Sequence, residues 1–410
     1  MNRIKKIGVI CTYQFPEGMA PTIRILAYCK GLRQNGVKTE VFTFKETPAD
    51  TTEPLEGEVQ EIPYHKSYLK RNDGSFSKIV DKLFMLKRLM KQINESHKKE
   101  PFDYLLLSFD TLDKFYIFVP LLKIQRYKLL FIGDEFPEPI RRLKEGIPIW
   151  QKYAYRFIYK FIDGRVLMTE NLKVFYDKEV CPKPTYILNS IIDEERFCNI
   201  HRQPVKQKYF CYMGNMQLAK DNVDDIIRAF SKISSSYPEY ELWLFGTPND
   251  KDRAIVESVI EDCKMQGKVF IKGRVDYNEV PQILANATIL VTSQPITKRA
   301  EGGFPTKMAE YMMSGTPMIV TNVGEIHKYV QDGITTYMVE PCDPHAYGNK
   351  LRHILSYPKE SEQVAQRAYN YAKANFCSKP VTNKLIDFLT QLKNRSHDTY
   401  KERTRFLHQG

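Results

Sequence analysis

Short apolar runs alternate with amphipathic stretches in two successive cycles along this chain. The runs of the first cycle predict strands at 7–12, 39–44, 103–109, 128–133 and 165–169. Those of the second cycle predict strands at 209–214, 241–246, 268–273, 287–292 and 317–321. Helical patterns separate the strands, and strands this apolar are typical of parallel sheets covered on both faces. We therefore predict an α/β fold with two Rossmann-like domains.

Other stretches have their own patterns. A helix is predicted from about Ile23 to a stop at Asn35 and Gly36, and the apolar residues of 223–233 keep helical spacing. Residues 45–75 are polar and rich in turn formers, which fits either a β-excursion or a mobile loop. We expect a helix from about Ser378 to Leu392, followed by a charged, frayed tail.

The composition is that of an ordinary globular protein and excludes several classes. Of the 410 residues, 42% are hydrophobic and 27% are charged, which suits two or three domains. No run of about 18 apolar residues occurs, and the first apolar run reads as a strand rather than as a signal peptide. The eight cysteines lack paired spacing, which argues against a zinc site or a disulfide framework and favours a reducing cytoplasm.

The net charge of +12 needs a partner or a structural explanation. Basic residues accompany an apolar stripe at 78–91 and alternate loosely with aromatic residues at 150–165. Such stretches fit an anionic membrane surface, or core helices with solvated basic faces, and the sequence leaves both open. Nucleic acid is not expected as a partner, because no nucleic-acid-binding signature accompanies the charge.

The most specific candidate for chemistry is the segment 301–317, which reads EGGFPTKMAEYMMSGTP. Gly302 and Gly303 predict a glycine-rich loop that approaches a ligand, and Pro305 suits the first position of a helix. The free N–H groups at that helix start can bind an anion such as a diphosphate. Helical spacing puts Thr306 and Lys307 on the face of Glu310, with Met308, Tyr311 and Met312 opposite. The structural alternative is that the glycines and the proline only form the turn between a strand and a helix.

A second anion-binding candidate follows the strand 209–214. Asn215 can donate a hydrogen bond to an anion, and Lys220 lies just before a predicted helix start, where its charge and the helix dipole act on the same phosphate. Arg274 or Arg299 can supply a further positive charge, or either can be a surface residue.

These segments resemble the signature of the retaining glycosyltransferases of family 4. GGFPTK, followed by EY and then by a glycine and a proline, is similar to a subset of that family, and residues 214–222 resemble its phosphate loop. Residues 16–36 are similar to its first loop and helix. The resemblance implies the GT-B fold: an acceptor-side domain at 1–190, a nucleotide-sugar domain at 191–378, and a helix and charged tail at 379–410, with the helix returning to the first domain.

The resemblance also implies roles for single residues. Glu310 matches the glutamate that bonds the nucleotide ribose. The glutamate that contacts the sugar would fall on Gly302, so either Glu301 reaches the sugar or backbone groups hold it. The catalytic candidates are Lys220, Glu310 and Glu301. The donor-binding candidates are Gly18, Asn215, Arg274, Gly302, Gly303, Phe304, Pro305, Thr306 and Glu310.

The acceptor side carries less signal. Asp134 and Glu135 follow the strand 128–133, where one of them can bind an acceptor hydroxyl or cap a helix before Pro137. Residues 169–171 occupy a similar strand end, with the same two interpretations.

The expected reaction moves a sugar from a nucleotide-sugar to a hydroxyl of a carbohydrate or lipid-linked acceptor, with retention at the anomeric carbon. No Asp-x-Asp clamp stands out, so we expect no metal and no cofactor. We predict a cytoplasmic enzyme, peripheral at the inner face of the plasma membrane, in cell-surface polysaccharide or glycolipid synthesis. The alternatives are a sugar-nucleotide epimerase of the same architecture and a catalytically inactive sugar-nucleotide-binding protein.

Overall fold

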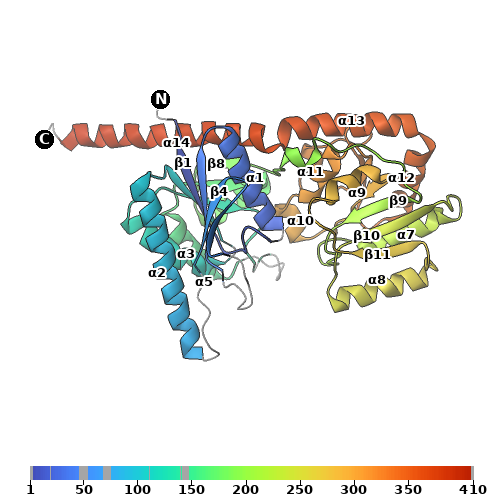
Figure 1. Cartoon of the computed structure of the whole chain (residues 1–410), viewed down its shortest axis with the longest axis horizontal. Coiled ribbons are helices and arrows are strands. Elements are labelled where there is room, and N and C mark those ends of the chain that lie inside the picture. The colour runs from blue at the N-terminus through green and yellow to red at the C-terminus, as the bar shows by residue number, and fades with distance from the viewer. Residues whose placement is uncertain are drawn as a thin grey trace. The chain divides into compact units, whose positions relative to one another are not determined.

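The computed structural model describes residues 3–18, 20–45, 54–67, 75–109, 111–138, 140 and 147–407. The chain divides into two compact units (Figure 1). Unit 1 comprises Met1–Ile191 and Ser378–Gly410, and unit 2 comprises Ile192–Cys377. Among the described helices, none is both long and apolar enough to cross a bilayer.

Unit 1 contains an eight-stranded sheet with the order β3-β4-β2-β1-β5-β6-β7-β8. Its strands are β1 (Lys6–Cys11), β2 (Lys38–Thr43), β3 (Glu56–Val59), β4 (Ile62–Lys66), β5 (Tyr104–Ser108), β6 (Leu129–Gly133), β7 (Gly164–Leu167) and β8 (Thr185–Ile187). The strands pair in parallel except that β3 is antiparallel to β4. The residues between β3 and β4, Gln60 and Glu61, both have positive φ, as a tight hairpin turn requires.

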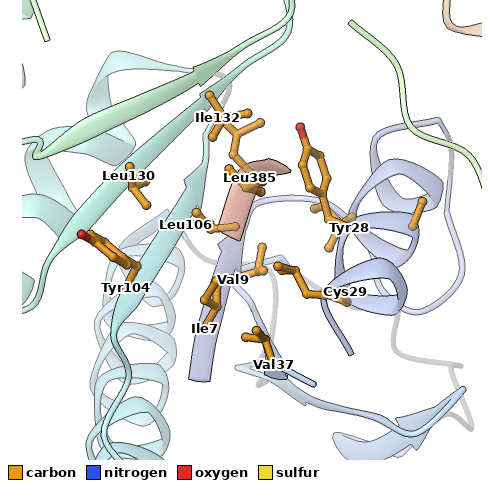
Figure 2. Packing of buried hydrophobic residues seen from close by; sticks show 14 of the residues in the cluster. Ile7, Val9, Tyr28, Cys29, Val37, Tyr104, Leu106, Leu130, Ile132 and Leu385 are labelled. Carbon is orange, nitrogen blue, oxygen red and sulfur yellow. The ribbon is translucent and has the colours of Figure 1, made fainter. Parts of the chain in front are cut away.

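Helices cover both faces of the unit 1 sheet. These are α1 (Ala20–Gln34), α2 (Ser75–Lys99), α3 (Leu112–Ile124), α5 (Ile149–Tyr159), α6 (Glu170–Phe175), the π-helical turn η1 (Tyr176–Val180) and α14 (Ser378–Leu407). On one face, Ile7 and Val9 of β1 pack with Tyr28 of α1 and Leu385 of α14 (Figure 2). The C-terminal helix therefore belongs to the core of unit 1.

Unit 2 contains a six-stranded, wholly parallel sheet with the order β11-β10-β9-β12-β13-β14. Its strands are β9 (Lys208–Met213), β10 (Tyr240–Phe245), β11 (Val269–Gly273), β12 (Ile289–Val291), β13 (Met318–Thr321) and β14 (Tyr337–Val339). Its helices are η2 (Glu194–Phe197), α7 (Val223–Ser234), α8 (Asp250–Asp262), α9 (Val280–Asn286), α10 (Lys298–Gly302), α11 (Thr306–Met313), η3 (Ile326–Lys328), α12 (Pro344–Ser356) and α13 (Pro358–Asn375). The buried apolar faces of α7 and α12 meet in its core.

The predicted α/β fold with two Rossmann-like units is confirmed, and several element bounds differ. Helix α1 begins at Ala20, three residues before the expected start. The β-excursion expected within 45–75 is present as β3 and β4, while 46–53 and 68–74 lie outside the described residues. Helix α14 continues to Leu407 instead of ending at Leu392, because residues 393–407 include five lysine and arginine residues, which favour helix, and neither glycine nor proline.

Candidate functional site

The order of strands in unit 2 creates a switch point between β9 and β12. From β9 the chain runs to β10 and β11 on one side, and then returns to β12 on the other side of β9. Connections that diverge in this way leave a crevice at the carboxyl ends of the two strands, where ligands of open α/β sheets bind. The segments at this point are 214–222, called here the Gly214 loop, and 292–305, which leads into α11.

Glycines let the strand ends at this edge approach one another closely. The Gly214 N–H donates to Phe245 O at 3.0 Å, and the Gly246 N–H donates to Gly273 O at 2.8 Å. Gly246 has a φ of +131°, and a Cβ there would lie 1.7 Å from the Gly214 carbonyl oxygen. No other residue fits at position 246 unless the Gly214 loop moves.

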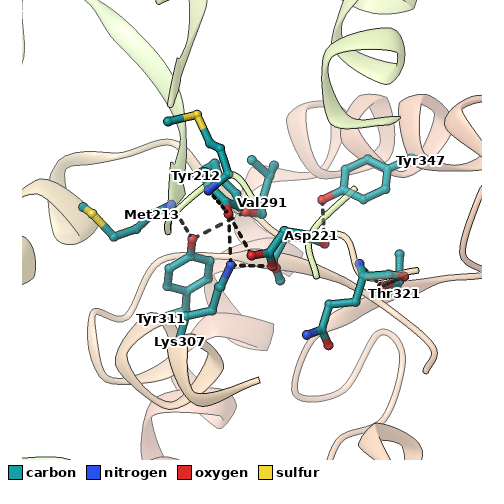
Figure 3. Close-up of polar contacts among 11 residues, drawn as sticks. Tyr212, Met213, Asp221, Val291, Lys307, Tyr311, Thr321 and Tyr347 are labelled. Carbon is teal, nitrogen blue, oxygen red and sulfur yellow. Dashed lines mark hydrogen bonds and ion pairs between the residues drawn. The ribbon is translucent and has the colours of Figure 1, made fainter. Parts of the chain in front are cut away.

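A buried ion pair fastens the Gly214 loop to α11 (Figure 3). Lys307 Nζ lies 2.7 Å from Asp221 Oδ1, and the Tyr212 hydroxyl donates to Asp221 Oδ2 at 3.0 Å. The side chains of Lys307 and Asp221 are only 15% and 3% exposed. Burial raises the pKa of Tyr212 well above its usual value, so its hydroxyl stays protonated. We call Tyr212, Asp221 and Lys307 the Asp221 cluster.

The same helix is bonded to β9 by a second contact. The Met213 N–H donates to the Tyr311 hydroxyl oxygen at 2.8 Å (Figure 3). A Cβ on Gly214 would lie 2.9 Å from Lys307 Nζ, so the lysine reaches directly beneath the Gly214 loop. The structure thus brings the two predicted anion-binding segments together, the loop after β9 and the start of α11.

The glycine-rich loop predicted at 301–305 is wrong in part. Glu301 and Gly302 lie in the short helix α10, and the loop is reduced to Gly303–Pro305. The Thr297 hydroxyl caps α10 by accepting from the Ala300 N–H at 3.2 Å, and Lys298 pairs with Glu301 at 2.6 Å. A side-chain cap and an (i, i+3) ion pair both favour a helical turn.

Two further residues of this segment differ from expectation. Pro305 is the N-cap of α11 and not its first helical residue. Gly303 has an ordinary φ of −95°, and a Cβ there would meet Arg299 O at 3.0 Å. Phe304 is buried against Tyr329 and Phe376, with ring centroids 5.5 and 5.8 Å away, so its contacts in the structure are with the core of unit 2.

Helix α11 has the two faces that the spacing predicts. Met308, Tyr311 and Met312 are buried, whereas Thr306 is exposed and Glu310 is half-buried. At the other end, Gly315 takes the positive φ of +69° that closes a helix.

Glu310 is held by an arginine that the sequence did not single out. Arg196 of η2 bonds Glu310 Oε1 at 2.5 Å, and its other terminal nitrogen donates to Tyr277 O at 2.5 Å. The guanidinium lies 3.4 Å from the Tyr277 ring centroid, and the Arg196 side chain is 8% exposed. The sequence signal was weak, because Arg196 lies in the irregular stretch that joins the two halves. This contact fixes the orientation of the Glu310 carboxylate.

The remaining candidates of unit 2 have different surroundings. Lys220 is half-buried in the turn before Asp221, where its N–H donates to Gln217 O at 2.8 Å, and Asn215 is exposed on the same loop. Arg274 is exposed after β11, three strand positions from β12. At ~4.8 Å per strand this separates it from the β12 end by about 14 Å. Arg299 lies half-buried in α10.

The acceptor-side candidates belong to unit 1. Asp134 Oδ1 lies 3.2 Å from Nε of Arg24, which also donates to Leu188 O at 2.8 Å. Burial raises the pKa of Asp134, while the charge of Arg24 opposes that rise. Asp134 therefore pairs with a buried arginine. Glu135 is half-buried beside it.

Two more strand ends of unit 1 are explained by local contacts. Thr169 caps α6 by accepting from the Leu172 N–H at 3.2 Å, which is the capping alternative for residues 169–171. Gly18 lies after β1, and a Cβ there would come within 2.2 Å of the Thr22 hydroxyl oxygen.

Within the described ranges, no three His, Cys, Asp or Glu side chains gather as a metal site, and metal independence stays a prediction.

The comparisons with known proteins address unit 2 most directly. Residues 193–371 match the family model of glycosyl transferases group 1. The match contains the Gly214 loop, α11 and Arg196. A poly(glycerol-phosphate) alpha-glucosyltransferase of Bacillus subtilis is 26% identical over 175 residues, which cover 42% of this chain and 25% of that protein. This chain thus spans about a quarter of that relative's length.

Solved structures resemble the whole chain. A glycosyltransferase of Rickettsia africae has a TM-score of 0.71 at 15% identity, covering 96% of this chain and 99% of that chain. The Anabaena protein HepE in complex with UDP-glucose has a TM-score of 0.67 at 11% identity, also covering 96% and 99%. At these identities the likeness establishes the fold, two Rossmann-like units of the GT-B class.

Proposed function

We propose that this chain is a retaining, family 4 type glycosyltransferase that moves a sugar from a nucleotide-sugar to a hydroxyl acceptor. The observation that carries the proposal is the bond between the Gly214 loop and α11 at the switch point of unit 2. Both segments lie within the residues that match glycosyl transferases group 1. We assign the donor to residues 191–378 and the acceptor to residues 1–190.

The proposed chemistry needs stabilisation of a leaving diphosphate. The bond from the anomeric carbon to the diphosphate breaks, the bond to the acceptor oxygen forms, and the acceptor proton passes to the leaving phosphate. Lys220 and the free N–H groups at the start of α11 offset the charge that develops on that phosphate. Preorganised donors of this kind contribute several kcal/mol to lowering a barrier.

The other contacts follow from the same placement. Glu310, oriented by Arg196, is assigned to the ribose hydroxyls, because a carboxylate accepts from both of a vicinal pair. The sugar is assigned to the neighbourhood of Glu301 and Gly303. Glu301 pairs with Lys298, and both side chains are 45% exposed, so Glu301 can exchange this partner for a sugar hydroxyl at small cost.

The names of the similar proteins support the donor class and the stereochemistry. One relative is named an alpha-glucosyltransferase, and HepE was solved with UDP-glucose. An alpha-glucosyl product made from an alpha-linked donor retains configuration, which supports retention here. We further propose that the enzyme is cytoplasmic, needs no metal, and acts in cell-surface polysaccharide or glycolipid synthesis.

A donor screen tests this proposal. UDP-, GDP- and ADP-sugars are compared by thermal shift of the full chain, since a ligand that binds only the folded state raises its stability. The donor that shifts the transition is then incubated with a panel of carbohydrate and lipid-linked acceptors after treatment with EDTA. We expect transfer with the donor's anomeric configuration in the product. An inverted product contradicts retention, and activity abolished by EDTA contradicts metal independence.

The same assay separates the alternatives. A sugar-nucleotide epimerase interconverts the donor when no acceptor is present, whereas a transferase leaves the sugar's configuration unchanged. An inactive binding protein shows the thermal shift and no turnover with any acceptor of the panel.

A further inference from the structure

Helix α5 exposes a stripe of large apolar side chains to solvent. Ile149, Tyr153 and Phe157 recur at intervals of four and are 75%, 63% and 55% exposed. Trp150 beside them is 66% exposed, and Phe161 just after the helix is 44% exposed. Residues three or four apart lie on one face of a helix, which joins Trp150 to Tyr153, and the rings of Phe157 and Phe161 have centroids 5.7 Å apart. The five side chains therefore form one surface.

The stripe extends onto α3 through a fixed contact. The Tyr116 hydroxyl donates to Ala154 O at 2.9 Å, and its ring lies nearly parallel to Phe157, with centroids 6.5 Å apart. Tyr116 is itself 40% exposed. The combined surface, called the α5 patch, consists of Tyr116, Ile149, Trp150, Tyr153, Phe157 and Phe161. Contiguous exposed apolar surface of this kind marks an interaction site more often than a solvated face.

The helices on this side of unit 1 also carry most of the chain's excess charge. Helices α2, α3 and α5 cover the sheet face opposite α1 and α14 (Figure 1). Phe131 of β6 contacts Phe115 of α3 and Tyr159 of α5 on this face. Its neighbours Leu130 and Ile132 point to the other face, where they pack with α1 and α14. Helix α2 has seven lysine and arginine residues and two acidic residues, and α3 has two basic residues and one acidic residue. Helix α5 has two basic residues and no acidic residue. The whole chain has a net charge of +12.

Some of these basic side chains are bonded within the protein, and others are exposed beside the apolar residues. Lys152 pairs with Glu179 Oε2 at 2.5 Å, and Arg156 donates to the Glu179 carbonyl at 3.0 Å. Lys160 is exposed at the end of α5, between Phe157 and Phe161. On α2, the exposed Ile79 and Leu83 lie beside exposed lysines at 82 and 87, whereas Lys91 pairs with Glu95 at 3.7 Å.

We propose that the α5 patch docks onto an anionic lipid bilayer. Tryptophan and tyrosine favour the interface between headgroups and acyl chains, where the ring is apolar and its polar atom stays hydrated. Lysine and arginine around such rings are attracted to anionic headgroups. The docking proposal does not depend on the proposed transfer reaction. If the chain is a transferase, docking gives it access to a lipid-linked acceptor.

Fluorescence of Trp150 tests the docking directly. The chain has two tryptophans, so a Trp243→Phe variant leaves Trp150 as the single reporter. With vesicles of phosphatidylglycerol and phosphatidylcholine at low salt, we expect a blue shift of its emission and quenching by brominated acyl chains. With vesicles of phosphatidylcholine alone, we expect little of either, because the electrostatic attraction is missing.

A vesicle sedimentation assay on variants tests the assigned surface. We expect Trp150→Ser/Tyr153→Ser/Phe157→Ser to weaken binding to the anionic vesicles at least about tenfold, because three interfacial side chains are lost. The control Ile255→Ser/Ile334→Ser changes two exposed apolar residues of unit 2 and should bind as the wild type does. An unchanged melting temperature establishes that each variant is folded.

Three results would overturn the proposal. The first is no binding of the wild-type chain to anionic vesicles at low salt. The second is binding that the triple variant retains, which assigns it to another surface. The third is self-association abolished by the triple variant without vesicle binding, which makes the patch a protein interface. A failure of sugar transfer leaves all three readouts unaffected, so the two proposals fail separately.

Discussion

At the scale of single residues, Lys307 is the side chain that joins the two parts of the candidate site. It carries its charge from α11 into the Asp221 cluster, where Asp221 is almost fully buried. A buried carboxylate without a cation is unstable, so the pair constrains the Gly214 loop to one position relative to α11. Lys307 is therefore a positioning residue for the diphosphate that we assign to these segments.

Replacing Lys307 tests this interpretation. Lys307→Met leaves Asp221 buried and unpaired, and we expect it to lower the free energy of unfolding by about 3 kcal/mol. The matched control is Lys298→Met, which breaks a pair of similar length whose partners are each 45% exposed. That loss should stay below about 1 kcal/mol. Urea unfolding of the full chain measures both, and equal losses would show that burial of the Asp221 pair contributes nothing.

A second buried network predicts how stability depends on pH. Burial alone would raise the pKa of Glu40, but bonds from His65, Ser96 and Lys6 outweigh it and lower the pKa from 4.5 to about 2. The folded state thus binds this proton less readily than the unfolded chain does. The resulting stability is present above pH 4.5 and is lost as the pH falls towards 2.

The Glu40→Gln variant isolates this effect. Relative to the variant, the wild type should be more stable by up to about 3 kcal/mol at neutral pH, and the difference should shrink steadily below pH 4.5. Urea unfolding at a series of pH values from neutral to acid measures it. A difference that stays constant down the series would contradict the assigned pKa.

The residues of the candidate site differ in how far the sequence could identify them. Spacing along a helix suffices to place Lys307 and Glu310 on one face, because helical geometry is local. The partners of these residues, Asp221 and Arg196, come from segments 86 and 114 positions away. Pairing over such distances depends on the fold, so the sequence did not predict it.

At the scale of elements, the carboxyl edge of the unit 2 sheet depends on close backbone approach. Gly246 combines a positive φ with contact to the Gly214 carbonyl, and so it fixes where the Gly214 loop leaves β9. Side chains are excluded there for two independent reasons, strain and collision.

A pair of glycine variants separates those two reasons. Gly246→Ala should lower the free energy of unfolding by more than about 2 kcal/mol, because backbone strain of about 1–2 kcal/mol adds to the cost of displacing the Gly214 loop. Gly267→Ala also lies at a positive φ, of +73°, but with nothing within 4 Å of the new Cβ, so it should show the strain of a positive φ without a collision. Urea unfolding measures the loss of stability in each variant. Equal losses would mean that displacing the Gly214 loop costs no free energy.

The elements that the sequence predicts well are those with a strong period. Buried strands such as β1 and β9 read as continuous apolar runs, and α7 shows its buried face in its spacing. Helix α10 has only five residues, of which two are charged partners and one is glycine, so its period is too short to detect. Strand β14 has three residues and was not predicted for the same reason.

At the scale of the whole molecule, the chain has two cores and one returning helix. Residues 378 onwards rejoin unit 1, where Leu385 and Leu389 are fully buried, while unit 2 is continuous from Ile192 to Cys377. A continuous unit that contains the Gly214 loop, α11 and Arg196 can build the donor site from its own residues. The central claim is that this site binds the diphosphate of a nucleotide-sugar.

Calorimetric titration of the donor found by the screen tests that claim most directly. Lys220→Ala and Glu310→Gln should each bind the donor at least about tenfold more weakly than the wild type, because each loses a charge-assisted contact of about 1.5–3 kcal/mol. The controls Lys251→Ala and Glu362→Gln change exposed residues of unit 2 and should bind as the wild type does. Wild-type affinity in both Lys220→Ala and Glu310→Gln would contradict the account.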